Sequence, residues 1–540
     1  MLDKTLAQSC KVLVVDDPVL AHGYLKFPLE DLGFQDVAYV GKVSQAKEAI
    51  HARSYDLIFC SYDIKKDTDG YFFYDEMVAN NEISPATAFI FISADTSLEL
   101  IHSIVELQPD DFLAKPFTIG DLSKRLHKVL TRKRALRKIY RYIEIGNYDK
   151  ALDTVNEFLT DSSKIQFFPQ ALKVKGEILY DQEKYREAKE FYIAVLNVQE
   201  FAWAQSGLIK ALIKLDEDDQ AEKMILRLAF KPESQLMAYD MLADLQIKQK
   251  DYDTALESSV VAAEVSPRNI RRHKKTVDLS RITNDYKTQF EASKKIVKAA
   301  KDSIHDQPEI YLDVARAGID SAMTTEEDET KVLAQQAESY LKQFEETADK
   351  RDVQEQLDVA QARLFQLHDE KDKAKKLLTT LQNDDWSALS TTDLMDRAKA
   401  YHEVGLHDQS QRIMEEIERR VRKDSSESEL FSEYVSKEKQ QRIDIKQTPK
   451  ELNNSAVRFY QRGDTDSAFK AFHQAFTIMP KNPSIALNLL QTMSRRALES
   501  GLEDSAKTVI ARCTKIIDSA DLDAEQKERY DKVRAQLSEM

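Results

Sequence analysis

The chain has 540 residues, of which 42% are hydrophobic and 32% are charged, and its formal net charge is −15. The hydrophobic content is sufficient for packed cores and argues against a disordered protein. The acidic balance argues against a general nucleic-acid-binding protein, so we expect no nucleic-acid partner. Glycine and proline contribute 12 residues each, about 2% against averages of about 7% and 5%. So few backbone breakers disfavour an all-β fold and indicate long helices.

The cysteines and the apolar runs indicate a cytoplasmic protein. Cys10, Cys60 and Cys513 lie far apart and have neither a disulfide-framework spacing nor a zinc-ligand spacing, which is typical of a reducing compartment. No run approaches the roughly 18 apolar residues of a membrane span. The N-terminal residues reach the acidic pair Asp16-Asp17 before a signal-peptide core could form. We therefore expect no membrane insertion.

Five short apolar runs alternate with amphipathic stretches in residues 1–120. Buried strands with helical crossovers predict an α/β domain with a doubly wound, five-stranded parallel sheet. We expect Pro28 to kink or break the first of the helices. After residue 115 the sequence carries no further strand signal. The predicted strands are 11–15, 36–40, 56–60, 89–92 and 111–114, and the predicted helices lie near 18–32, 43–53, 71–80 and 97–107.

From about residue 134 the chain repeats a turn followed by a helix. Variants of the signal include GNYDKAL (146–152), EKYREAK (183–189), KDYDTAL (250–256) and GDTDSAF (463–469). Small residues and prolines recur at fixed spacing within the units, so two antiparallel helices can approach closely and the proline ends the second helix. This pattern resembles the tetratricopeptide repeat, a helix–turn–helix unit of about 34 residues.

Repeats of this kind leave an apolar face uncovered, so neighbouring units stack into an all-α solenoid. We expect the solenoid to present a groove that binds a peptide or a helix, and the alternative is that it serves only as a spacer. One stretch carries few apolar residues and no repeat signature, and we interpret it as a polar linker. The alternative is that this stretch docks onto the solenoid through Leu430, Phe431 and Tyr434. The predicted domains are 1–130 (α/β), 131–420 (repeats), 421–448 (linker) and 449–540 (repeats).

Polar side chains stand where the predicted strands end. In open α/β sheets, ligands bind at the carboxyl ends of the strands. There the sequence offers an acidic pair, two small hydroxyl residues and a lysine that follows an aromatic residue by three positions. In chain order these residues are Asp16, Asp17, Ser61, Ser93, Phe112 and Lys115.

This order of residues, over about 9–130, resembles the receiver domain of bacterial response regulators. The resemblance implies that Asp16 and Asp17 hold Mg²⁺. It also implies that Ser93 and Lys115 contact a phosphoryl group and that Phe112 is the aromatic residue that turns inward on activation. In that family an aspartate at the end of the third strand accepts the phosphoryl group, and here Ser61 occupies its position.

A serine at the acceptor position changes the chemistry. Phosphoryl transfer needs an ionised nucleophile placed on Mg²⁺, whereas the Ser61 hydroxyl is neutral and has no adjacent base in this set. The lost carboxylate also removes a metal ligand, so we expect no cofactor beyond weak Mg²⁺ at Asp16 and Asp17. Aligning on a shorter loop would place Tyr62 at the acceptor, which is no aspartate either. The sequence therefore predicts a non-phosphorylatable pseudo-receiver.

Asp63 is the alternative acceptor. On a strand that continued to residue 63, its side chain would share the face of Ser61. It would lie about 6–7 Å further along the strand, and phosphoryl transfer tolerates little misplacement.

Receiver–tetratricopeptide proteins with a degenerate acceptor resemble auxiliary two-component regulators of the VieB type. The resemblance implies a binding protein, not an enzyme, that inhibits a sensor histidine kinase or a partner response regulator, for example a cyclic-di-GMP phosphodiesterase. One alternative is a phosphorylatable response regulator that uses Asp63. Another is a scaffold or adaptor for pilus or secretion assembly. The sequence carries no metalloprotease, Walker A or serine-hydrolase motif.

Overall fold

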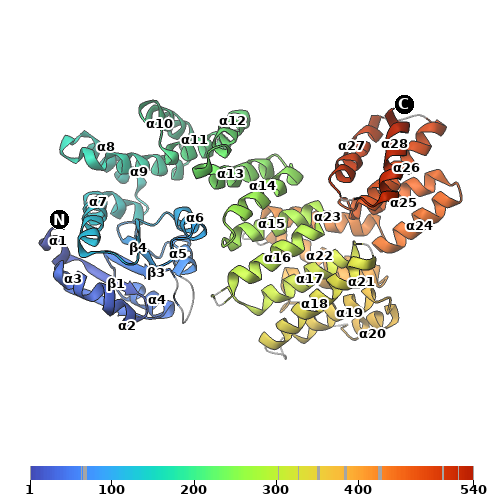
Figure 1. Ribbon diagram of the computed structural model, residues 1–540, viewed down its shortest axis with the longest axis horizontal. Coiled ribbons are helices and arrows are strands. Elements are labelled where there is room, and N and C mark those ends of the chain that lie inside the picture. Colours follow the sequence, from blue (N-terminus) through green and yellow to red (C-terminus); the bar gives the residue numbers. More distant parts are fainter. Residues whose placement is uncertain are drawn as a thin grey trace. The chain divides into compact units, whose positions relative to one another are not determined.

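The computed structural model describes residues 2–62, 64, 70–301, 303, 305–325, 327–348, 353–381, 386–423, 428–500, 504–520 and 522–538. The chain forms two compact units (Figure 1). The first comprises Met1–Asn269 with Ala299–Asp306, and the second comprises Ile270–Lys298 with Gln307–Met540. None of the helices that the structure describes combines the length and the apolarity needed to span a lipid bilayer.

The first unit begins with a five-stranded parallel sheet in the order β2-β1-β3-β4-β5. This confirms the predicted doubly wound α/β fold. The aliphatic and aromatic runs of the three central strands are buried on both faces because helices cover the sheet, whereas the two edge strands are mostly half-buried. The strands are β1 (Lys11–Val15), β2 (Asp36–Val40), β3 (Leu57–Ser61), β4 (Ala88–Ser93) and β5 (Asp111–Ala114).

Helices cover the sheet at the predicted positions, and one further helix, α1, precedes the first strand. One hydrophobic core joins Val12, Val14, Phe59 and Ile90 of the strands to Leu25 of the first crossover. The helices are α1 (Lys4–Ser9), α2 (Pro18–Ala21), α3 (Phe27–Asp31), α4 (Val43–Ala52), α5 (Gly70–Ala79), α6 (Leu98–Leu107) and α7 (Ile119–Glu144).

Pro28 is accommodated by a change of helix type. Between α2 and α3 lies a π-helical turn, His22–Lys26. Proline lacks an N–H, and its ring clashes with the carbonyl of the residue four positions earlier, here Tyr24. A wider turn upstream of the proline relieves that clash. The predicted interruption of the helix is therefore a π-helical turn within a continuous helical stretch.

Helix α7 connects the α/β domain to the helices that follow. Leu122, Leu126 and Val129 belong to the core beneath the sheet, whereas Leu136 and Ile139 belong to the next core along the chain. The boundary that we predicted after residue 130 thus falls inside one uninterrupted helix.

After β5 the structure describes helices and no strand, which is consistent with an all-α solenoid. In the first unit, Tyr192 fills the space between two neighbouring helices. A Cβ on Gly176 would lie 2.5 Å from the Tyr192 ring, and one on Gly207 would lie 2.2 Å from it, so both positions require glycine. The helices are α8 (Tyr148–Thr160), α9 (Phe168–Asp181), α10 (Tyr185–Val198), α11 (Ala202–Lys214), α12 (Asp218–Ala229), α13 (Gln235–Lys248) and α14 (Tyr252–Val265).

The second unit continues the helical array. Small residues again pack at the helix contacts, where Ala456 and Ala468 are fully buried. The helices are α15 (Ile270–Thr283), α16 (Tyr286–Ala300), α17 (Pro308–Met323), α18 (Glu327–Thr347), α19 (Gln354–Leu367), α20 (Lys371–Thr380), α21 (Thr391–Glu403), α22 (His407–Lys423), α23 (Glu429–Asp444), α24 (Pro449–Gln461), α25 (Thr465–Ile478), α26 (Pro483–Ser500), α27 (Asp504–Asp518) and α28 (Ala524–Ser538).

The segment predicted as a polar linker, 421–448, is largely helical in the part of it that the structure describes. Residues Glu429–Asp444 form helix α23, which is capped by Ser428 and packs against α15 and α22. Phe431 and Tyr434 are buried, whereas Leu430 is only half-buried. The helix buries Phe431, Tyr434 and Val435 together with the charged Glu438, despite its polar sequence.

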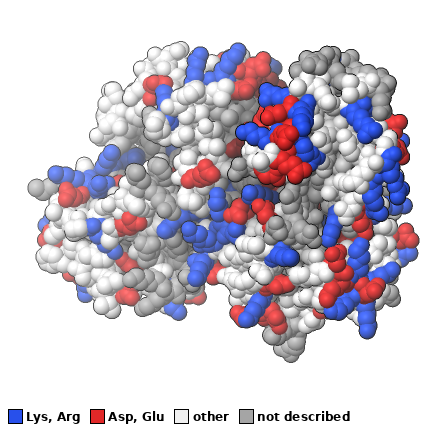
Figure 2. Space-filling model, turned by 45° about the vertical axis from the view of Figure 1, so that its right-hand side comes forward, with Lys and Arg blue, Asp and Glu red and all other residues white. Residues whose placement is uncertain are grey.

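Ion pairs join consecutive helices across the surface of the array. Lys189 of α10 pairs with Glu217 at 2.6 Å, and Lys248 of α13 pairs with Asp218 of α12 at 2.9 Å. On the face drawn in Figure 2, acidic and basic side chains are interspersed. Exposed pairs of this kind contribute little stability individually.

Candidate functional site

The sheet brings the predicted site residues to one edge. Ser61 and Ser93 are the last residues of the adjacent strands β3 and β4, and both are buried. Asp16 directly follows β1, which lies on the other side of β3. Lys115 directly follows β5, and its main-chain N–H donates to the carbonyl oxygen of Ser93 at 2.8 Å. The strand order reverses its direction between β1 and β3, which is where open α/β sheets form their ligand crevice.

The Asp16 carboxylate is engaged by three donors. Its Oδ2 accepts a hydrogen bond from the Tyr24 hydroxyl at 2.5 Å and lies 3.2 Å from Lys115 Nζ. Its Oδ1 accepts from the main-chain N–H of Asp17 at 2.7 Å. The carboxylate is almost fully buried, so Lys115 supplies the positive charge that a buried carboxylate requires.

Tyr24 is a site residue that the sequence did not reveal. It lies on the π-helical turn, its hydroxyl donates to Asp16, and Lys115 Nζ lies 4.0 Å from its ring centroid. Burial and the hydrogen bond to Asp16 raise the pKa of Tyr24 well above its ordinary value, so it acts as a donor. The only sequence signal for this contact was Pro28, because that proline induces the π-helical turn. The spacing of residues does not show that the turn brings Tyr24 to Asp16.

Asp17 caps the first crossover helix. Its Oδ1 accepts from the N–H of Val19 at 3.0 Å, and Pro18 occupies the first helical position. Among the residues that the structure describes, no group of three His, Cys, Asp or Glu side chains is arranged to hold a metal ion. Mg²⁺ prefers oxygen ligands in octahedral geometry. Asp16 and Asp17 could supply two of these ligands only if Lys115 released Asp16.

The remaining predicted residues surround this cluster. Gly70, the first residue of α5, lies against Ser61, and a Cβ on it would lie 2.1 Å from the Ser61 carbonyl oxygen. Ser93 Oγ accepts from the N–H of Asp95 at 3.0 Å. Phe112 is half-buried on β5. Asp63, the alternative acceptor, lies outside the described residues.

Comparison with known proteins agrees with this geometry. Residues 12–127 match the response regulator receiver domain family. Residues 12–127 therefore form a receiver domain. A probable chemotaxis protein CheY of Rhizobium etli is 29% identical over 125 residues, which cover 23% of this chain and 95% of that protein. The family match and this relative cover the α/β domain alone, and an all-helical region follows it.

Solved structures resemble separate parts of the chain. The receiver domain of the sensor histidine kinase PA1611 from Pseudomonas aeruginosa PAO1, determined with a magnesium ion in its active site cleft, is 24% identical. It covers 23% of this chain and 98% of its own, with a TM-score of 0.21. A tetratricopeptide repeat protein from Parabacteroides merdae is 13% identical and covers 48% of this chain and 95% of its own, with a TM-score of 0.27.

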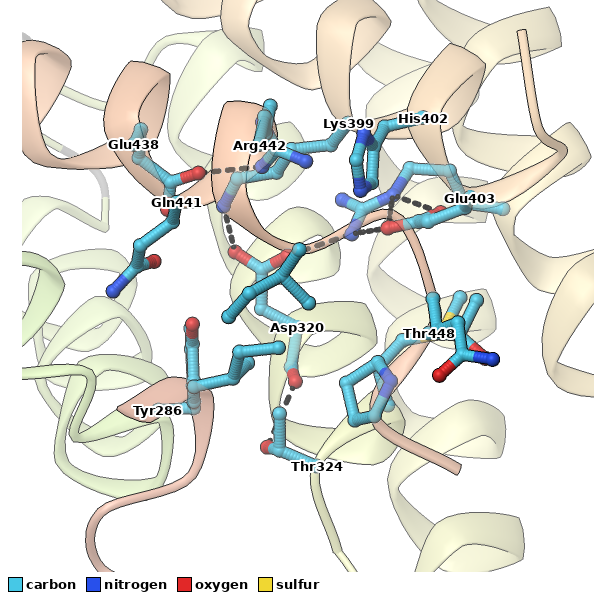
Figure 3. Close-up of a pocket in the computed structure, with 16 residues that line it drawn as sticks. Tyr286, Asp320, Thr324, Lys399, His402, Glu403, Glu438, Gln441, Arg442 and Thr448 are labelled. Atoms are coloured by element: carbon cyan, nitrogen blue, oxygen red, sulfur yellow. Dashed lines mark hydrogen bonds and ion pairs between the residues drawn. The ribbon is translucent and has the colours of Figure 1, made fainter. Parts of the chain in front are cut away.

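A second candidate site lies inside the second unit (Figure 3). A cavity of about 90 Å³ is lined by polar side chains from several helices, among them Asp320 of α17, Arg363 of α19 and Lys399 of α21. Arg363 is only 2% exposed, and its guanidinium contacts Asp320, Asp396 and Glu403 at 2.7 Å each. Lys399 Nζ lies 2.7 Å from the other Asp320 oxygen.

The charges around this cavity hold one another ionised. Lys399 and Arg363 keep the pKa of Asp320 below its ordinary value although burial opposes ionisation. Burial raises the pKa of Glu403 in spite of Arg363. Burial, assisted by Arg442, lowers the pKa of His402 to about 3, so this imidazole is neutral at pH 7. Separating one member of such a network is costly, because the partner would remain buried and unpaired.

Proposed function

We propose that this chain is a non-phosphorylatable receiver–tetratricopeptide regulator that binds components of a two-component phosphorelay and inhibits them. The observation that carries the proposal is the position of Ser61. It ends β3 at the same edge of the sheet where Asp16, Ser93 and Lys115 lie. A neutral hydroxyl there is no phosphoryl acceptor. The Lys115–Asp16 ion pair adds to this, because it occupies the carboxylate that Mg²⁺ would need. The chain then acts by binding and not as an enzyme.

An exposed apolar strip beside this edge supports a docking role. Leu20, Gly23 and Phe27 lie at consecutive turns of the first crossover, and Leu20 and Phe27 are 60% and 66% exposed. A Cβ on Gly23 would meet no atom within 4 Å, so a partner helix could approach the backbone there. Exposed apolar residues that cluster on one face mark interaction surfaces. We infer that a sensor histidine kinase or a partner response regulator docks on this strip.

The helical array supplies the second contact of the proposed regulator. Two linked sites that engage one assembly gain affinity through effective concentration. An inhibitor of this kind would compete with a phosphorylatable receiver for the kinase. Alternatively, it would bind the partner regulator, for example a cyclic-di-GMP phosphodiesterase, and keep it inactive. This agrees with the resemblance to auxiliary regulators of the VieB type.

The proposal is tested by adding the full chain to sensor kinases of the source organism with labelled ATP and their cognate regulators. We expect less phosphorylated regulator and no label on this chain. The matched variants are Gly23→Glu, which places a charge on the strip without an internal clash, and Gly120→Glu, at an open position on α7. Inhibition that is lost in the first and kept in the second supports docking through the strip. Label on this chain would instead favour the phosphorylatable alternative.

The scaffold for pilus or secretion assembly makes a different prediction. If the receiver domain is only a cap for the array, none of the kinases is inhibited, and the Gly23→Glu variant still binds assembly proteins as the unmodified chain does.

A further inference from the structure

Helix α23 interrupts the pairing of helices in the second unit. Its neighbours in sequence form antiparallel pairs, α21 with α22 and α24 with α25, whereas α23 packs against α22 and against the distant α15. It also contributes Tyr434 and Glu438 to the lining of the polar interior, beside residues of α17 and α21. The helix therefore contacts or faces helices of several pairs, as a helix bound in the predicted groove of the array would.

Charged and polar contacts hold α23 in place. The Tyr434 ring lies 5.9 Å from the Arg281 guanidinium of α15 and 5.8 Å from Lys399 Nζ of α21. The ammonium group of Lys437 donates to the Ile282 carbonyl oxygen. The helix also buries Val435, and Lys439 pairs with Glu418 of α22 at 2.7 Å. A short apolar face and individual polar contacts therefore hold α23, and not a continuous apolar seam.

A buried carboxylate completes the inward face of α23. Glu438 is 4% exposed, and Arg442 and Lys399 keep its pKa below its ordinary value although burial opposes ionisation. Figure 3 shows Glu438, Gln441 and Arg442 of α23 above Asp320. Phe431, Tyr434 and Glu438 are spaced by three and four residues and share one face of the helix.

Space remains along the inward face of α23. The cavity of about 90 Å³ adjoins Glu438 and Arg442, and a smaller one of about 30 Å³ adjoins Phe431 and Tyr434. Both pockets are partly open to solvent, and the atoms that line them lose contacts that a closely packed helix would make. The fit between α23 and the surrounding helices is therefore incomplete, as expected for an occupant that can leave.

We propose that α23 is a built-in occupant of the helix-binding surface of the array and that a partner helix displaces it. The partner presents the chemistry of α23, namely aromatic side chains at positions i and i+3 and a carboxylate at i+7. Arg281 and Lys399 receive the second aromatic ring, and Lys399 receives the carboxylate. This inference deepens the proposed function, because it names the kind of partner that the array takes and the contact that keeps the array closed.

The test measures binding of a fluorescent peptide of residues 428–445 to the full chain. In the unmodified chain α23 competes with the peptide, so the apparent affinity is reduced by the fraction of chains that are open. Phe431→Ala with Tyr434→Ala in the chain loosens α23, and we expect the peptide to bind at least about tenfold more tightly. Ser432→Ala with Gln440→Ala, on the exposed face of the same helix, should leave the affinity unchanged. A peptide with Tyr434→Ala and Glu438→Gln should bind weakly to every chain.

Hydrogen exchange on the unmodified chain gives a readout that needs no variant to fold. We expect the amides of Glu429–Asp444 to exchange faster than those of α21, which a displaceable helix requires. Equal protection of the two helices, or equal peptide affinity for the unmodified and loosened chains, would overturn the inference. Neither measurement contains a kinase, so such a failure would leave the proposed docking on the receiver strip standing.

Discussion

Lys115 and Asp16, which are 99 residues apart in sequence, form an ion pair at the carboxyl edge of the sheet, with 3.2 Å between Nζ and Oδ2. The lysine follows β5 and the aspartate follows β1, so the parallel topology alone brings them together. Asp16 Oδ2 also accepts the Tyr24 hydroxyl. The pair gives the site an internal counter-charge and makes Lys115 the competitor of any metal ion.

Removing this competitor should strengthen metal binding. We expect Lys115→Ala to raise the Mg²⁺ affinity of the full chain about three- to tenfold, because Asp16 would lose its resident cation. Titration calorimetry measures the change. Lys47→Ala is the control, because it removes a lysine that pairs with Glu76 at 2.6 Å away from the site. Unchanged or weaker Mg²⁺ binding by Lys115→Ala would contradict this role of the ion pair.

The apolar strip on the receiver should contain an affinity hot spot. We expect Phe27→Ser to weaken binding to the kinase or regulator that the chain inhibits by about tenfold, because an aromatic anchor is lost. Its thermal stability should be nearly unchanged, since Phe27 is 66% exposed. Val105→Ser, at a 63% exposed position on α6, is the matched control. Equal losses in both variants would argue against a specific strip.

The second unit should lose stability in acid through His402. Its pKa falls from an ordinary 6.5 to about 3 on folding, so between these values the unfolded chain binds the extra proton. This stabilisation is complete above pH 6.5 and is lost as the pH falls toward 3. We expect His402→Gln to reduce the loss between pH 6.5 and 4 by about 1–2 kcal/mol, measured by urea unfolding. The exposed His127→Gln should leave the pH dependence unchanged, and a profile unaltered by His402→Gln would contradict the assignment.

The sheet and most of the site could be predicted because their signals are local and strong. Runs such as KVLVV and FIFI are buried on both faces, so they read as strands without any tertiary information. Once the strands are parallel, the residues that follow them must meet at one edge. Asp16, Ser61, Ser93 and Lys115 were found in this way.

Tyr24 could not be predicted, and the sequence left α23 open between a linker and a docked segment, for different physical reasons. The position of Tyr24 depends on a π-helical turn, which shifts the helix register and cannot be read from a pattern with a period of 3.6 residues. Helix α23 buries charge as well as apolar area, and its Glu438 is stabilised by cations that include Lys399, 39 residues earlier. A polar segment that is buried by distant charges looks like a linker until the fold is known.

The most direct test of the account is incubation of the full chain with radiolabelled acetyl phosphate and Mg²⁺. We predict no stoichiometric label on the unmodified chain, and acid-stable, base-labile label on the Ser61→Asp variant, which restores a carboxylate at the end of β3. Stoichiometric label of that kind on the unmodified chain, abolished by Asp63→Asn, would contradict the account and establish a phosphorylated switch.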